Sequence, residues 1–296
     1  MAEQKVPVGA QYEILKFLYR WKLVTTKALP KRFFPMVMPI TGYQHLLEMR
    51  DRWKCIEWAC DPMGRSWAWT LTQQGFRWLR KLDLDAAENG FRSEHYAHDL
   101  LVSAVHIGDW LAEKRNDENL FSEQELRRYP LEQYPDWVPK SKDHRSDGYW
   151  RIIRDGDVSG AVALEVELSL KSADEYVDIG RFYETHKDKL FRVVWIVKDL
   201  RKAKRIQQGL TKYAFGEKRD YHAFFLLPDF FFSGWEAKIV LGRENDLGKS
   251  LDRMINGPKP DQISYKKVCT EILLEQHKSP KPSTTPMSYS SRLYLC

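Results

Sequence analysis

The chain has 296 residues, of which 43% are hydrophobic, 13% aromatic and 30% charged. This length corresponds to about two domains, and the composition excludes a chain that is disordered throughout. No run of about 18 apolar residues occurs, so we expect no membrane-spanning helix. The N-terminal stretch MAEQKVPVGA lacks the apolar region of a secretory signal. Four scattered cysteines are too few for a disulfide framework, which predicts a reduced, cytoplasmic compartment.

The net charge of +6 comes entirely from the first part of the chain. Residues 1–85 hold 14 Lys and Arg against 8 Asp and Glu, whereas residues 86–296 hold 33 of each kind. A basic N-terminal region on a neutral remainder indicates a polyanionic partner, most simply double-stranded DNA. A solvated basic surface without a partner explains the charge equally well.

Residues 1–85 are predicted to form three helices, a β-hairpin and a last helix, from apolar spacing and turn signals. The expected helices are Gln11–Trp21, Leu29–Phe34, Gly42–Trp53 and Gln73–Leu82, and the expected strands are Lys54–Ala59 and Ser66–Leu71. Thr25 and Thr26 are the cap candidates for the second helix, and Thr72 is expected to cap the last one. This order is typical of a winged helix-turn-helix domain, and Leu71-Thr72-x-x-Gly75 looks like the end of the wing in many winged-helix regulators.

In a winged-helix domain the third helix enters the major groove and the wing contacts the DNA backbone. The polar and basic candidates for these contacts are Gln44, His45, Arg50, Arg52, Lys54 and Arg65. A winged helix that binds a protein instead of DNA is the alternative, and the basic excess disfavours it.

A polar, acidic linker is expected at residues 83–92, and a second domain is expected at residues 93–242. Its predicted elements are a helix at Glu94–Lys114, a short piece at Leu120–Glu125, strands at Tyr149–Arg154, Ala161–Leu170, Arg192–Lys198 and Tyr221–Leu227, and helices at Ala173–His186 and Leu200–Tyr213. This alternation predicts helices around a small mixed sheet. Residues 243–296 are expected to be a C-terminal extension, with a disordered tail from residue 277.

Three carboxylates in this second domain are spaced as in a metal site. Asp147 enters one strand, and Glu165 and Glu167 lie two residues apart on the next, so they share one face of that strand. Carboxylates that converge at a sheet end suit Mg²⁺, which can activate water and neutralise a scissile phosphate. A nearby lysine, such as Lys171, would stabilise the transition state. A metal site without catalysis and a solvated strand edge with ion pairs are the alternatives.

Asp147, Glu165-x-Glu167 and Lys171 resemble the PD-(D/E)-x-K motif of the restriction-endonuclease-like core. More narrowly, the layout resembles the replication-relaxation proteins of plasmids and other mobile elements, which join a winged helix to a nuclease-like domain. The resemblance covers roughly residues 10–230. The matching pieces are Leu71-Thr72-x-x-Gly75, Phe121-Ser-Glu-Gln-Glu-Leu-Arg127, Ser146-Asp147-Gly148, Glu165-Val-Glu167-Leu-Ser-Leu-Lys171, Tyr176, Tyr183 and Val193–Val197.

The resemblance implies an α+β and α/β chain, with an N-terminal winged helix-turn-helix followed by a restriction-endonuclease-like mixed-sheet domain. It implies Asp147 as the first metal ligand, Glu165 or Glu167 as the second and Lys171 as the catalytic lysine, with Glu123 as a further acid and Mg²⁺ as the cofactor. Three positions depart from the motif: Ser146 replaces proline, Glu167 replaces lysine, and Lys171 lies four residues after Glu167. Four residues span ~13 Å along a strand, so a lysine side chain closes that gap only if the strand bends at Ser169.

These observations favour a DNA-binding protein that acts in the replication, mobilisation or processing of a plasmid or mobile element. The alternatives are a Mg²⁺-dependent DNA endonuclease and a protein-interaction scaffold. The expected partners are double-stranded DNA, other replication, mobilisation or transposition proteins, and a second copy of the chain in a possible homodimer. No membrane partner is expected.

Two further patterns have weaker functional interpretations. His95, His98 and Asp99 share one helix face and could hold a transition metal, but the sequence shows no distant third ligand, so a plain helix surface is favoured. The helix predicted at Leu200–Tyr213 is basic on several faces, which fits either contacts to a DNA backbone or simple solvation. Cys55 and Cys60 are expected to serve in packing.

Overall fold

The computed structural model describes residues 9–26, 28–60, 67–82, 95–107, 119–154, 157–211 and 221–256. All of the described residues belong to one compact unit. Arg65, the expected linker at residues 83–92 and the expected tail from residue 277 lie outside the described residues.

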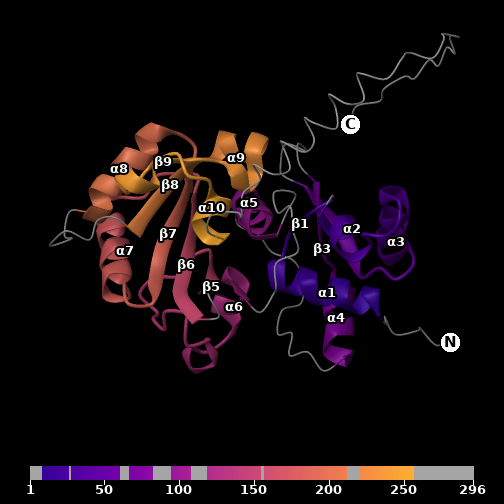
Figure 1. Ribbon diagram of the computed structural model, residues 1–296. Coiled ribbons are helices and arrows are strands. Elements are labelled where there is room, and N and C mark those ends of the chain that lie inside the picture. The colour runs from indigo at the N-terminus through magenta and orange to yellow at the C-terminus, as the bar shows by residue number, and fades with distance from the viewer. Residues whose placement is uncertain are drawn as a thin grey trace, which may run out of the picture. The chain divides into compact units, whose positions relative to one another are not determined.

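The N-terminal elements form a small three-stranded antiparallel sheet with four helices, in the predicted order (Figure 1). They are α1 (Ala10–Trp21), β1 (Val24–Thr25), α2 (Ala28–Phe33), α3 (Pro39–Asp51), β2 (Ile56–Cys60), β3 (Trp67–Leu71) and α4 (Gln73–Lys81). The sheet order is β1-β3-β2. The Thr72 side chain accepts a hydrogen bond from the Gly75 N–H at 3.1 Å, which confirms the predicted cap.

Two local predictions in this region need correction. The helix α3 begins at Pro39, three residues before the expected start at Gly42. Proline is favoured in the first turn of a helix because its missing N–H would have no partner there, which explains why the helix begins at Pro39. The strand β1 was not predicted, because a two-residue strand is too short to show alternation.

The remaining elements build a mixed sheet, as predicted, and its six strands have the order β4-β5-β6-β7-β8-β9, of which β9 was not predicted. The strands β6, β7 and β8 are parallel, and the other neighbouring pairs are antiparallel. The strands are β4 (Leu120–Ser122), β5 (Gly148–Arg154), β6 (Asp157–Glu167), β7 (Leu190–Val197), β8 (His222–Leu226) and β9 (Ile239–Leu241). The helices are α5 (Tyr96–Ile107), α6 (Glu123–Arg128), α7 (Ala173–Thr185), α8 (Leu200–Thr211), α9 (Leu227–Ser233) and α10 (Leu251–Asn256).

Helices cover both faces of the sheet (Figure 1). Alternate residues of β6 point to opposite faces, so Ala161 and Ala163 pack with the apolar side chains of α7 and α8. Val162 and Leu164 pack with those of α5, α9 and α10. No helix among the described residues is both long and apolar enough to cross a membrane.

The strand β6 ends at Glu167 and not at the predicted Leu170. The chain bends at Leu168 and Ser169, and Ser172 then caps α7 in a capping box with Glu175. The alternating apolar residues Leu168 and Leu170 suggested a longer strand, but the cap at Ser172 starts the helix soon after the last strand residue. The bend turns the following Lys171 back toward Glu167.

Candidate functional site

Four buried carboxylates, Glu123, Asp147, Glu165 and Glu167, gather at one end of the six-stranded sheet and are here called the acid cluster. Their residues are only 4–8% exposed. Asp147 directly precedes β5, and its N–H donates to the Leu164 carbonyl at 2.9 Å. Its Oδ2 accepts from the Val166 N–H at 2.6 Å. The antiparallel pairing of β5 with β6 therefore brings Asp147 to the carboxyl end of β6, where Glu165 and Glu167 lie.

The glycine after Asp147 is required by its surroundings. Gly148 has a φ of +140°, a conformation that side chains disfavour, and a Cβ there would lie 2.5 Å from the His106 ring. The His106 Nε2 is 3.0 Å from the Asp147 carbonyl oxygen. The Ser146-Asp147-Gly148 motif thus allows a buried imidazole on α5 to approach the backbone that carries the first acid.

Glu165 is held from two sides. The His144 Nε2 lies 2.7 Å from its Oε1, and the Tyr183 hydroxyl on α7 donates to the same oxygen. Burial lowers the pKa of His144, but the charge and hydrogen bond of Glu165 outweigh burial and raise that pKa overall. Sequence analysis did not single out His144, because a histidine alone in a loop shows no periodic signal; the structure brings it to the site.

Glu167 forms an ion pair with Lys171. Burial raises the pKa of Glu167. The hydrogen bond and charge of Lys171 lower this pKa but do not cancel the rise, and the charges of Glu165 and Asp147 raise it further. Burial lowers the pKa of Lys171, whereas its hydrogen bond to Glu167 and the nearby carboxylates raise it overall. The gap expected between Lys171 and Glu167 is closed because β6 ends before Ser169.

Glu123 joins the cluster from the first turn of α6. Arg127, one turn later, donates to its Oε1 from Nε at 2.7 Å. Burial raises the pKa of Glu123, and the charge of Asp147 raises it further against the opposing effect of Arg127. Ser122 caps α6 in a capping box, which fixes the start of the helix and therefore the position of Glu123, its first residue.

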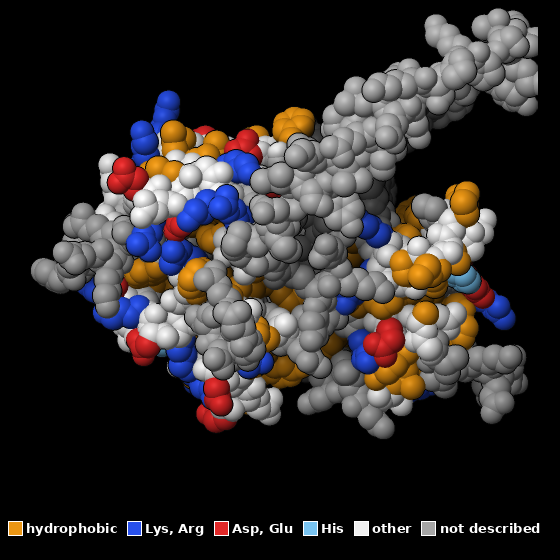
Figure 2. All heavy atoms as spheres, in the orientation of Figure 1, with side chains coloured by type: hydrophobic (Ala, Val, Ile, Leu, Met, Phe, Trp, Pro, Cys, Tyr) orange, Lys and Arg blue, Asp and Glu red, His pale blue; other side chains and the backbone are white. Residues whose placement is uncertain are grey.

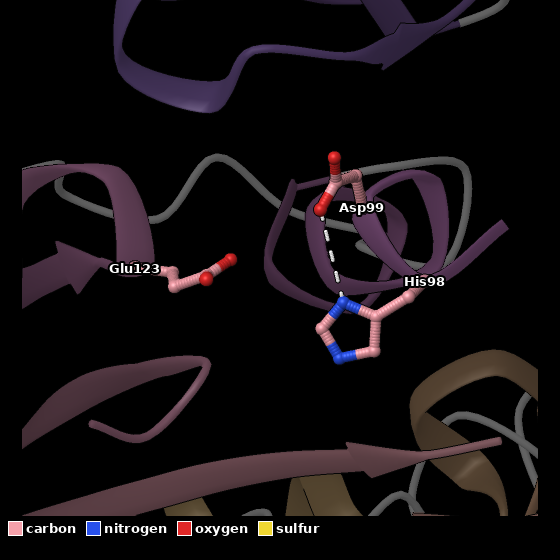
Figure 3. A group of neighbouring side chains, drawn as sticks. All are labelled: His98, Asp99 and Glu123. Carbon is pink, nitrogen blue, oxygen red and sulfur yellow. Dashed lines mark ion pairs between the residues drawn. The ribbon is translucent and has the colours of Figure 1, made fainter. Parts of the chain in front are cut away.

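A histidine and an acid on α5 complete the site, as Figure 3 shows for His98, Asp99 and Glu123. The donor atoms of these three residues all lie within 4.8 Å of one another. The His98 Nε2 is also 3.3 Å from Asp147 Oδ1. Burial lowers the pKa of His98, but the charge and hydrogen bond of Asp147 and the hydrogen bond of Asp99 raise it to about 11. The acid that could complete a metal site with His98 and Asp99 is therefore Glu123, 24 residues after Asp99 along the chain.

The donor set suits a divalent cation of the Mg²⁺ or Mn²⁺ class. Carboxylate oxygens predominate, which favours hard cations, and one imidazole nitrogen adds a ligand that Mn²⁺ accepts more readily than Mg²⁺. Asp99 and Glu123 each have a cationic partner: Lys22 lies 2.7 Å from Asp99, and Arg127 contacts Glu123. Partners of this kind orient the ligands around a metal centre.

The candidate DNA-binding residues are spread along α3 and the loop after it. Gln44 and His45 are exposed on α3, and His45 stacks on Phe34 with ring centroids 4.8 Å apart. Arg50 pairs with Asp51 and lies over the Trp58 ring, whereas Arg52 pairs with Glu48 at 3.0 Å. Lys54 is exposed and has a φ of +54°.

Scans against protein-family models, curated proteins and solved structures found no match for this chain. The function is therefore inferred from the residues themselves and from their arrangement.

Proposed function

We propose that this protein binds double-stranded DNA and hydrolyses a phosphodiester bond at the acid cluster with a divalent cation. One observation carries the proposal: the buried acids Asp147, Glu165 and Glu167 lie at one sheet end, and Lys171 from the loop after β6 pairs with Glu167. Burying several ionised carboxylates together costs free energy unless a bound cation or proton neutralises their charge.

The residues that would hold the cation are His98, Asp99 and Glu123, and Asp147 lies beside them, 3.3 Å from His98. The fit rests on the donor chemistry, since buried carboxylate oxygens and one imidazole form a set typical of Mn²⁺ or Mg²⁺. When bound, such a cation supplies charge stabilisation to a phosphate and lowers the pKa of a bound water.

The other side chains position these groups. His144 and Tyr183 fix Glu165 in one orientation through contacts to the same oxygen. Lys171 contributes a positive charge beside Glu167, at a location where charge on a scissile phosphate would develop. Glu167 occupies the usual lysine position of the motif, so the lysine from beyond the bend takes the role.

The N-terminal elements support the DNA-binding half of the proposal. Three helices, a hairpin and a fourth helix follow the order of a winged helix, and α3 would be the helix in the major groove. Gln44 and His45 are exposed there for base contacts, while Arg52 and Lys54 are exposed for phosphates. The resemblance described above extends the proposal to replication, mobilisation or processing of a mobile element.

A second candidate is a DNA-binding scaffold that does not cut. Lys171 pairs with Glu167, Arg127 pairs with Glu123, and His98 contacts Asp147. Glu165 lies 2.7 Å from His144, so all four acids in the cluster already face a cationic or imidazole side chain. Such internal pairing favours a site that needs no metal ion.

The test compares the wild type with Asp147→Asn, because the amide oxygen of asparagine can still accept the Val166 N–H bond while the charge is removed. We expect Mn²⁺- or Mg²⁺-dependent plasmid cleavage to fall by a factor of about 100 or more. We expect Mn²⁺ binding, measured by calorimetry, to weaken as well, and DNA affinity in EDTA to stay within about twofold.

The matched control is Asp143→Asn in the same loop, because Asp143 is exposed and pairs only locally with Ser141. It should cut like the wild type. Cleavage that survives in Asp147→Asn would refute the site. DNA binding by the wild type with neither cleavage nor Mn²⁺ binding would favour the scaffold.

A further inference from the structure

The outer face of α8 carries a row of cations. Arg201, Lys204 and Arg205 are exposed, and their spacing of three and four residues places them on one side of the helix. These three residues are here called the cationic row. The opposite side is apolar and buried against the sheet, and its residues are Ala203, Ile206 and Leu210.

No acid balances this row within its helix. The segment Leu200–Thr211 contains no Asp or Glu. Within the described part of the chain, the row forms no ion pair with a side chain. Like charges three and four residues apart repel one another on a helix. A polyanion that lies along the row would offset this repulsion. A surface that only faces solvent would not need to gather cations without acids between them.

The row begins beside the acid cluster. Val197, the last residue of β7, pairs with Glu167 in the parallel register. The exposed Lys198 therefore follows at the same sheet end as the acids. The Lys202 Nζ donates to the Leu168 carbonyl at 3.1 Å, which ties the first turn of α8 to the bend after β6.

The helix is held firmly in that place. A Cβ on Gly209 would lie 2.7 Å from the Tyr176 side chain, and a Cβ on Gly180 of α7 would lie 2.7 Å from the Leu210 carbonyl oxygen. These glycines allow α7 and α8 to pack closely, Gly180 against the backbone of Leu210 and Gly209 against the Tyr176 side chain. Tyr176 also accepts a hydrogen bond from the Lys171 N–H at 3.0 Å, so the same packing reaches the acid cluster.

We propose that the cationic row is a phosphate-contact surface that holds a DNA backbone beside the acid cluster, separately from the N-terminal elements. The inference rests on the proposed function, since DNA is the polyanion that both require. Figure 2 shows Lys and Arg side chains projecting at the upper left of the molecule, in the region where Figure 1 labels α8. The phosphodiester backbone fits the row because it is a line of negative charges that exposed Lys and Arg side chains neutralise.

The test uses the full chain with the triple variant R201Q/K204Q/R205Q and measures duplex DNA affinity against salt in EDTA. Each phosphate that a cation neutralises contributes about 0.9 to the slope of log K against log salt. We expect the slope to become shallower by about two to three, and the affinity at low salt to fall roughly tenfold or more. Circular dichroism and thermal melting confirm that the variant is folded.

The matched control is R181Q/K187Q/R253Q, which removes the same charge from exposed positions on α7, after α7 and on α10. Its slope should equal that of the wild type. A wild-type slope in the row variant, or equal losses in both variants, would overturn the proposal. Loss of heparin binding with unchanged DNA binding would also overturn it, since the row would then serve another polyanion.

The assay in EDTA separates this proposal from the proposed function. If the wild type does not cut DNA, the row variant can still show a shallower slope of log K against log salt. If the wild type cuts DNA, the row variant can still have the wild-type slope. If the row is correct and the protein also cuts, the row variant should cut more slowly in proportion to its weaker binding. Its Mn²⁺ binding should be unchanged, because the row lies outside the acid cluster.

Discussion

At the scale of single residues, His222 shows how burial sets the charge of a side chain in this protein. His222 lies in β8 and is 4% exposed. Its Nδ1 accepts the Trp195 indole N–H at 3.0 Å, so the ring is neutral with its proton on Nε2. Its ring also neighbours those of Tyr183 and Tyr221. Burial lowers its pKa to about 3, since no described acid compensates a charge there.

This lowered pKa predicts a loss of stability in acid. Between the ordinary histidine pKa of about 6.5 and the folded value of about 3, the unfolded chain binds a proton that the folded chain does not. The free energy of unfolding should therefore fall as pH drops below about 6.5, by about 1.4 kcal/mol per pH unit from this residue alone. Urea unfolding at pH 7.0, 5.5 and 4.5 measures it.

The control is His222→Gln, which keeps a hydrogen-bond acceptor for Trp195 and cannot titrate. It should be less stable than the wild type at pH 7, and its stability should depend less on pH between 7.0 and 4.5. Parallel curves for the two proteins would show that His222 does not account for the acid sensitivity.

At the scale of elements, a short bend determines the geometry of the site. The end of β6 at Glu167 and the cap at Ser172 leave four residues to reverse direction, and Lys171 is the last of them. The Ser172 side chain accepts from the Glu175 N–H at 3.3 Å. A capped helix start therefore fixes the position of the lysine that the acid cluster requires.

Removing this cap should weaken α7 and the site together. We expect Ser172→Ala to lower the free energy of unfolding by about 1 kcal/mol, because an N-cap serine satisfies an otherwise unpaired helix N–H. For a chain of this size the melting temperature should fall by about 2–4 °C. Ser169→Ala is the control, because Ser169 is exposed in the bend and caps no helix. Equal melting temperatures for the two variants would contradict the role of the cap.

At the scale of the whole molecule, the N-terminal elements and the six-stranded sheet share one hydrophobic core. Residues of α1 and α4 belong to the same buried cluster as those of β5 and β6. Trp21 of α1 packs on His106 with ring centroids 5.0 Å apart, and His106 packs on Trp150 at 5.1 Å. Arg20 adds an ion pair to Glu125 at 3.0 Å.

This shared core predicts that Arg20 and Glu125 are energetically coupled. Their side chains are 18% and 15% exposed, so water screens the pair only partly. A double-mutant cycle with Arg20→Gln and Glu125→Gln should give a coupling energy of about 1–2 kcal/mol. The control cycle uses Arg52 and Glu48, whose side chains are 74% and 40% exposed, and should give below about 0.5 kcal/mol. Equal couplings would show that the first pair does not link the two sheets.

The pattern of the sequence by itself determined most of the elements and their order. Apolar spacing located α1, α7 and α8, and alternation located β5 and β6, because those signals depend only on neighbouring residues. The same local rule placed Glu165 and Glu167 on one face. It also predicted that Asp147 lies at the same sheet end, since a hairpin brings the ends of its strands together.

Other features required tertiary structure, because they depend on residues far apart in the chain. The contacts of His144 with Glu165 and of His98 with Asp147 arise from the packing of α5 and a loop against the sheet end, and no period in the sequence reports them. The pairing of Lys171 with Glu167 needed the bend that capping imposes. Strand spacing alone predicted a gap, because it assumed an extended backbone where the folded chain turns.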